Sequence, residues 1–138
     1  MDPTRSGVNL LAAIPVKPFG VAKARLADVL TPQQRARLGT AVAARTAVLA
    51  RQAGARVVIV TGDHAVAEWA ESIGFETLGE GPQAGLDAAA TAAARMASDS
   101  GLRWAIVHAD LPLVTVADLR GVFAAARDGE VLVPSHDG

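Results

Sequence analysis

The chain has 138 residues, a formal net charge of −1 and no cysteine. Hydrophobic residues make up 51% and charged residues 20%, which excludes a disordered chain and predicts a single α/β domain over residues 1–138. Without cysteine, disulfides, zinc–thiolate sites and thiol nucleophiles are excluded. The nearly neutral net charge gives no basic surface field that would attract nucleic acid. No apolar run reaches the roughly 18 residues of a membrane span, and the polar first residues do not resemble a signal peptide. We therefore expect a cytoplasmic protein.

Apolar runs separated by Gly, Pro and polar residues predict strands that alternate with helices. The predicted strands, in chain order, are Val8–Ile14, Arg56–Thr61, Phe75–Leu78, Trp104–Val107 and Val131–Val133. The predicted helices are a short one around Lys23–Val29, then Pro32–Gln52, His64–Ile73, Leu86–Ser98 and one that follows Thr115. Since the strands do not alternate apolar and polar residues, we expect an open, mostly parallel sheet with right-handed crossovers and helices on both faces. Leu38, Val42 and Leu49 are expected on the inward face of the long helix.

Capping residues mark where three helices begin. Thr31 precedes Pro32, which is typical of an N-cap followed by proline at the first helical position. Asp63 is predicted to cap the next helix, which explains it better than an acid–base role. Thr115 and Asp118 have the spacing of a capping box.

The loop after the first strand is the strongest candidate for chemistry. It places Lys17, Lys23 and Arg25 within nine residues, and cations near the amide groups at a helix start suit phosphates. The loop matches neither the Walker A nor the dinucleotide fingerprint. Lys17 and Lys23 are also the two lysines of a chain that otherwise uses arginine. From spacing alone, solvated surface charges are an equally good interpretation.

Two further loops follow predicted strands. Asp110 comes directly after a buried strand and could hold a magnesium ion that arrives with a nucleotide, or it could cap a turn before Leu111 and Pro112. His108 is expected to be structural. The segment Gly81–Asp87 could bring backbone close to a flat ligand, and Asp87 could accept hydrogen bonds from a guanine edge or merely stabilise a helix start.

These residues resemble a known family. The segments Ile14–Pro18, Ala22–Ala27 and Leu30–Pro32, with Arg35, resemble the opening of the 2-phospho-L-lactate guanylyltransferases, whose relatives use phosphoenolpyruvate, in biosynthesis of the deazaflavin coenzyme F-420. Gly85–Ala89 and Ala109–Leu113 resemble the G-L-N-x-A and A-D-L-P segments of that family, respectively. The resemblance implies a Rossmann-like nucleotidyltransferase fold of the nucleotide-diphospho-sugar transferase type.

The resemblance also assigns roles to particular residues. It implies that GTP and a small phosphorylated carboxylic acid are the substrates and that Mg²⁺ is the cofactor. Lys17, Lys23 and Arg25 would hold the phosphates and act in catalysis, with Pro15 beside them in the nucleotide site. Gly85 and Asp87 would lie against the guanine, and Asp110 would bind Mg²⁺.

The sequence departs from the family pattern in two places. Asp87 stands where the family usually has Asn, which leaves the base contact open. Asp137–Gly138 matches the start of a D-G-G-T-N segment, so we expect the acceptor-binding residues and a second metal-binding Asp to lie beyond the sequence given. An exposed last strand would invite pairing between chains, which leaves a homodimer open.

The sequence is also compatible with two other functions. One is a different nucleotidyltransferase of the same fold, of the molybdopterin or sugar-1-phosphate type, although those usually open with G-G-x-[ST]-x-R-M-G. The other is a nucleotide-binding module without catalytic activity.

Overall fold

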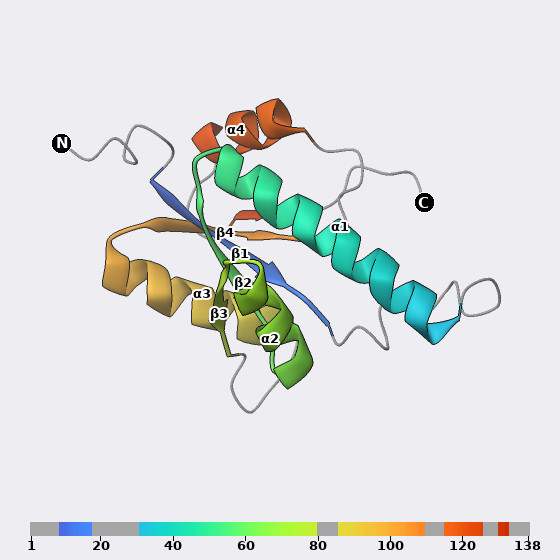
Figure 1. Ribbon diagram of the computed structural model, residues 1–138. Coiled ribbons are helices and arrows are strands. Elements are labelled where there is room, and N and C mark those ends of the chain that lie inside the picture. Colours follow the sequence, from blue (N-terminus) through green and yellow to red (C-terminus); the bar gives the residue numbers. More distant parts are fainter. Residues whose placement is uncertain (1–8, 18–30, 80–85, 110–114, 126–129, 133–138) are drawn as a thin grey trace.

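The computed structural model describes residues 9–17, 31–79, 86–109, 115–125 and 130–132 (Figure 1). Within these ranges, strands and helices alternate along the chain. The strands are β1 (Leu10–Pro15), β2 (Arg56–Val60), β3 (Glu76–Leu78), β4 (Arg103–Val107) and β5 (Glu130–Leu132). The helices are α1 (Pro32–Gln52), α2 (His64–Ser72), α3 (Leu86–Ser100) and α4 (Val116–Ala125). The short helix predicted around Lys23–Val29 lies outside the described residues.

The strands form one parallel sheet in the order β3-β2-β1-β4-β5. The first strand in the sequence lies at the centre, where Ala13 is paired with Val58 of β2 on one side and with Ile106 of β4 on the other. This is the open parallel sheet that the sequence predicts. Neighbouring strands are therefore joined by helices rather than by hairpins.

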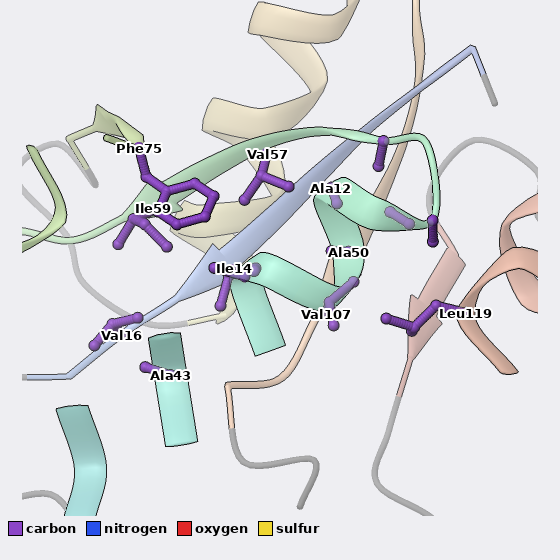
Figure 2. Close-up of a cluster of buried hydrophobic side chains, with 14 of the residues drawn as sticks. Ala12, Ile14, Val16, Ala43, Ala50, Val57, Ile59, Phe75, Val107 and Leu119 are labelled. Carbon is purple, nitrogen blue, oxygen red and sulfur yellow. The ribbon is translucent and has the colours of Figure 1, made fainter. Parts of the chain in front are cut away.

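Helices cover both faces of the sheet, as expected. One face carries Ala12 and Ile14 of β1 and is packed by α1, α2 and α4 (Figure 2). The opposite face carries Leu11 and Ala13 and is packed by α3. Because both faces are buried, the strands read as continuous apolar runs.

One crossover has the opposite hand from the rest. The crossovers β1-α1-β2 and β2-α2-β3 lead from the centre of the sheet toward β3, and both helices lie on one face. The crossover β3-α3-β4 leads in the opposite direction with its helix on the other face, so all three crossovers have the same hand. The crossover β4-α4-β5 leads in the same direction along the sheet as β3-α3-β4, but α4 lies on the face that α1 and α2 cover. Its hand is therefore the opposite one. The prediction of uniformly right-handed crossovers is therefore wrong for this link. Leu119 and Phe123 hold α4 there, since both are buried in the core on that face.

The long helix α1 begins as predicted but packs differently. The Thr31 hydroxyl accepts a hydrogen bond from the Gln34 amide at 3.1 Å, and the Gln34 side chain accepts one from the Thr31 amide at 2.8 Å. The predicted inward face is only partly right: Leu49 is half-buried and packs against the core, whereas Val42 is half-buried and Leu38 is 37% exposed. The fully buried face instead consists of small residues, namely Ala43, Thr46, Ala47 and Ala50. Small side chains let the helix approach the sheet closely, which larger ones at the same positions would prevent.

The other predicted caps are confirmed. The Asp63 carboxylate accepts a hydrogen bond from the Val66 amide at 3.0 Å at the start of α2. Thr115 and Asp118 exchange two hydrogen bonds of 3.0 and 3.1 Å before α4. Just past the end of α1, Gly54 has a φ of 103°, a conformation that glycine adopts at little cost.

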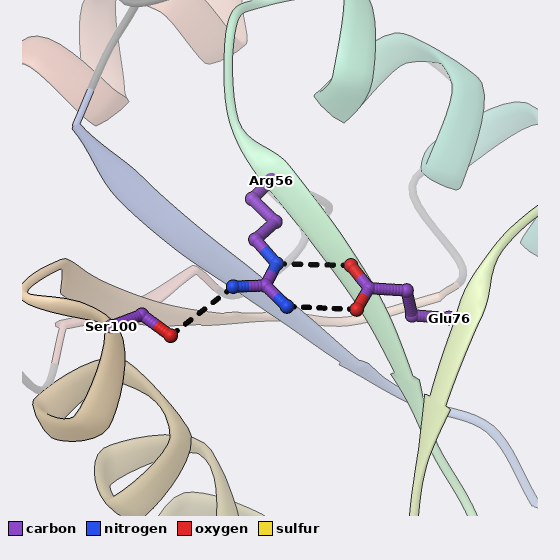
Figure 3. A network of polar contacts seen from close by, with 3 residues as sticks. All are labelled: Arg56, Glu76 and Ser100. Atoms are coloured by element: carbon purple, nitrogen blue, oxygen red, sulfur yellow. Dashed lines mark hydrogen bonds and ion pairs between the residues drawn. The ribbon is translucent and has the colours of Figure 1, made fainter.

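An ion pair joins three elements at the amino ends of the strands (Figure 3). The Arg56 guanidinium donates to the Glu76 carboxylate at 2.8 and 2.9 Å and to the Ser100 hydroxyl at 3.1 Å. Hydrogen bonding to Arg56 lowers the pKa of Glu76. Since Arg56 and Glu76 open β2 and β3 and Ser100 ends α3, this cluster marks the amino edge of the sheet.

Candidate functional site

The strand order directs attention to the carboxyl ends of β1 and β4. Open α/β sheets bind ligands outside the carboxyl ends of their strands, at the point where the strand order reverses. Here the order reverses between β1, which ends at Pro15, and its neighbour β4, which ends at Val107. The candidate site therefore lies at this edge, opposite the amino edge that Arg56 marks.

At the end of β1, the backbone is held in place one residue past the strand. The Val16 amide donates a hydrogen bond to the Val60 carbonyl of β2 at 3.0 Å, and the Val16 side chain is buried. Pro15 is half-buried, whereas Lys17 is exposed. The sheet thus presents the ammonium group of Lys17 to solvent from a fixed stretch of backbone, which suits recognition of an anion.

At the end of β4, a side chain of α1 holds the backbone. The Thr46 hydroxyl donates a hydrogen bond to the carbonyl of Ala109 at 2.9 Å. Ala109 and His108 are half-buried, and Ala109 packs against the core beneath α1. The segment that leads to Asp110 is therefore tied to α1.

The start of α3 reaches the same edge from the other face. This helix follows the carboxyl end of β3, packs across β1 and β4, and ends before the first residue of β4. It therefore runs antiparallel to the strands, and Asp87 in its first turn lies at their carboxyl edge. Asp87 is exposed, and its backbone carbonyl accepts a hydrogen bond from the Thr91 hydroxyl at 2.9 Å. A carboxylate in the first turn interacts favourably with the helix dipole, and its exposure leaves it accessible at this edge.

The predicted site residues that lie within the described ranges share the carboxyl edge of the sheet. Pro15 and Lys17 follow β1, and Asp87 opens α3. The remaining predicted site residues, Lys23, Arg25, Gly85 and Asp110, lie outside the described residues.

Acidic and histidine side chains do not form a ready-made metal cage in the described ranges. No group of three or more His, Cys, Asp or Glu residues that could hold a metal ion occurs there. A magnesium ion bound with nucleotide phosphates needs only one or two protein carboxylates. The role predicted for Asp110, which lies outside the described residues, therefore stays a prediction. Asp63 is used as a helix cap, and His64 pairs with Glu68 at 2.7 Å on an exposed surface.

Thr46 is a residue of this edge that the sequence reasoning missed. It is fully buried and polar, which is rare in this core. The signal in the sequence is a hydroxyl residue in a helical row that is otherwise Ala43, Ala47 and Ala50. Its partner 63 positions away could not be found from the helix pattern.

The parallel sheet, its strand order and a lysine at its carboxyl edge define a Rossmann-like α/β protein. The family described as Guanylyl transferase CofC like matches residues 10–138, and the chain belongs to that family.

Curated relatives agree with this assignment. The chain is 38% identical over 132 residues to a phosphoenolpyruvate guanylyltransferase of Chloroflexus aggregans, with 90% of the chain and 65% of the relative covered. It is 40% identical over 119 residues to the enzyme of the same name from Salinispora arenicola, with 84% and 54% covered. It is 33% identical over 129 residues to a 2-phospho-L-lactate guanylyltransferase of Methanothermobacter thermautotrophicus, with 92% and 57% covered. The chain therefore spans between about half and two thirds of the length of these relatives.

The helices of the described ranges are too short or too polar to cross a bilayer.

Proposed function

We propose that the protein transfers GMP from GTP to phosphoenolpyruvate or 2-phospho-L-lactate, with release of pyrophosphate, in the cytoplasm and as part of coenzyme F-420 biosynthesis. The observation that carries the proposal is the family match over residues 10–138. The named activities of the relatives support it, and so does the position of Lys17 at the carboxyl edge of β1.

Cations supply most of the catalysis in this proposal. The acceptor phosphate oxygen forms a bond to the α-phosphorus of GTP while the bond from that phosphorus to the bridging oxygen breaks, and pyrophosphate leaves. A phosphate oxygen is already an anion near neutral pH, so the step needs no general base. Lys17, Lys23 and Arg25 would orient the phosphates and offset the charge that moves onto the leaving group.

Magnesium is part of the proposal as the partner of the nucleotide. Asp110 would be its ligand from this chain, since a carboxylate directly after a strand at this edge suits a hard cation. When bound, the ion neutralises phosphate charge and polarises the phosphoryl group.

The base would lie at the start of α3. An ionised Asp87 accepts hydrogen bonds but donates none, so it matches the two N–H donors of the guanine edge. Adenine presents a different set of donors and acceptors at that edge. We therefore propose that Asp87, with Gly85 two residues earlier in the sequence, contributes to the choice of GTP.

Pyrophosphate release from GTP tests the proposed reaction. The assay uses GTP, Mg²⁺ and either acceptor, with a full-length enzyme that is unchanged or carries Lys23→Ala or Asp110→Ala. Both substitutions are expected to abolish release, while Arg95→Ala, an exposed cation on α3, leaves it unchanged. Near-normal turnover by either site variant would contradict the assignment.

The same assay separates the alternatives. Release from CTP, ATP or UTP in preference to GTP would favour another nucleotidyltransferase of the same fold. Binding of GTP without release with either acceptor would favour a nucleotide-binding module.

A further inference from the structure

The buried hydroxyl of Thr46 joins the middle of α1 to the end of β4. Thr46 has no exposed surface, and its neighbours on the buried face of α1 are alanines. Its hydroxyl hydrogen is shared between the carbonyl of Val42, one turn earlier at 3.0 Å, and the carbonyl of Ala109 at 2.9 Å. The second bond links residues that are 63 positions apart.

Packing alone does not account for a hydroxyl at this position. The surrounding face of the helix is apolar, and a hydroxyl there must find a partner or carry the cost of its lost hydration. The local bond to Val42 would satisfy the donor by itself, as it does for Thr40, whose hydroxyl donates to the Ala36 carbonyl at 2.7 Å. Thr46 differs because its hydroxyl also reaches a carbonyl outside its own helix.

The acceptor of that bond lies where the sheet no longer fixes the chain. The registered pairing of β4 ends with Val107, which is paired with Leu132. Ala109 follows two residues later and precedes Asp110 in the sequence. A hydrogen bond from a rigid helix to the Ala109 carbonyl therefore fixes the backbone at the point from which Asp110 departs.

We propose that Thr46 is a positioning residue of the nucleotide site: its hydroxyl anchors the carbonyl of Ala109, the residue that precedes Asp110 in the sequence. The inference rests on the proposed function for the role of Asp110, but the anchoring itself depends only on the contact between α1 and the end of β4. Side chains that hold the ligands of a metal in place typically affect metal affinity 10- to 100-fold when they are removed.

The test compares four forms of the protein: unchanged, Thr46→Val, Thr46→Ser and Thr40→Val. Valine keeps the shape of threonine and removes the hydroxyl, and serine restores the hydroxyl. Thr40→Val is the matched control, because it removes a hydroxyl that donates to the carbonyl of the preceding turn within α1. Thr46→Ala replaces the valine variant if valine prevents folding, which the melting temperature reports.

Two measurements are made on each form. The first is hydrogen–deuterium exchange of the segment 108–115, which needs no ligand and no activity. The second is the Mg²⁺ concentration that gives half-maximal pyrophosphate release from GTP. Thr46→Val is expected to speed exchange in that segment and to raise the half-saturating Mg²⁺ concentration about tenfold or more, while Thr46→Ser and Thr40→Val stay close to the unchanged protein.

Unchanged exchange and unchanged Mg²⁺ dependence in Thr46→Val would overturn the proposal, and so would equal shifts in Thr40→Val. Faster exchange with an unchanged Mg²⁺ dependence would overturn the link to the site. If the unchanged full-length enzyme releases no pyrophosphate, the proposed function fails and the link to the site fails with it, whereas the exchange comparison still decides whether Thr46 anchors Ala109.

Discussion

Lys17 is exposed and lies two residues past the end of the buried central strand β1. The first five residues of β1, Leu10–Ile14, are at most 1% exposed, and the Val16 amide donates a hydrogen bond to β2. A flexible lysine on such a support loses little further backbone freedom when it binds a phosphate, because the fold has already fixed its backbone.

Replacing Lys17 therefore tests the phosphate site directly. Lys17→Ala is expected to weaken GTP binding roughly 10- to 100-fold, since a charge-assisted hydrogen bond is worth about 1.5–3 kcal/mol. The melting temperature should hardly change, because Lys17 is exposed. Calorimetric titration with GTP measures the effect, with Arg95→Ala as the exposed control. Equal affinities for the two variants would remove Lys17 from the site.

Asp87 has two physical roles that one substitution can separate. As a charge in the first turn of α3, it stabilises the helix by about 0.3–1 kcal/mol. As a guanine ligand, it would favour GTP over ATP. Asp87→Ala should lower the ratio of GTP to ATP affinity as well as the melting temperature. A lower melting temperature with an unchanged affinity ratio would leave Asp87 a purely structural residue.

At the scale of elements, the small side chains on the buried face of α1 determine how closely this helix packs on the sheet. Ala47 is fully buried, whereas Ala41 on the same helix is exposed. Ala47→Leu is expected to lower the free energy of unfolding by about 1–3 kcal/mol through overpacking, and Ala41→Leu should be close to neutral. Urea denaturation of the two variants measures the difference. Similar stabilities would show that the helix can move away from the sheet at little cost.

The Arg56–Glu76 pair predicts a dependence of stability on pH. Because the pKa of Glu76 is lowered in the folded state, the pair stabilises the protein above the unfolded pKa, and this contribution is lost as the pH falls through the folded pKa. The side chains are 41% and 51% exposed, so solvent screens the pair, and the coupling should be about 0.2–1 kcal/mol at neutral pH. A double-mutant cycle with Arg56→Ala and Glu76→Ala measures it. The coupling should vanish well below about pH 4, and a coupling that persists there would contradict this account.

Local signals in the sequence predicted the elements well and their packing less well. Thr31, Asp63 and Thr115 each cap a helix as predicted, because capping depends on residues three positions away. The inward face of α1 is predicted correctly for Leu49, which packs against the core, but not for Leu38, because the close approach of helix and sheet selects small residues at the fully buried positions. The hand of the β4-α4-β5 crossover depends on the face of the sheet against which Leu119 and Phe123 are buried. No local sequence pattern determines that face.

At the scale of the whole molecule, the parallel sheet explains how residues far apart in the sequence share one edge. Lys17 and Asp87 were predicted to act together from separate loops, and the strand order and the direction of α3 bring both to the carboxyl edge. Thr46 could not be predicted, because its bond to Ala109 depends on the docking of α1 beside β4. Pairing of chains through the last strand stays a prediction.

The most direct test of the central claim is the map of amide chemical-shift changes when GTP and Mg²⁺ are added to the ¹⁵N-labelled protein. The account predicts that the largest changes fall on the carboxyl edge, at Val16, Lys17, Asp87 and Ala109, and that equal ATP produces smaller ones. The amide chemical shift of Arg56, at the amino edge, should stay unchanged. Changes concentrated at the amino edge, or none at Lys17 and Ala109 with saturating GTP, would contradict it.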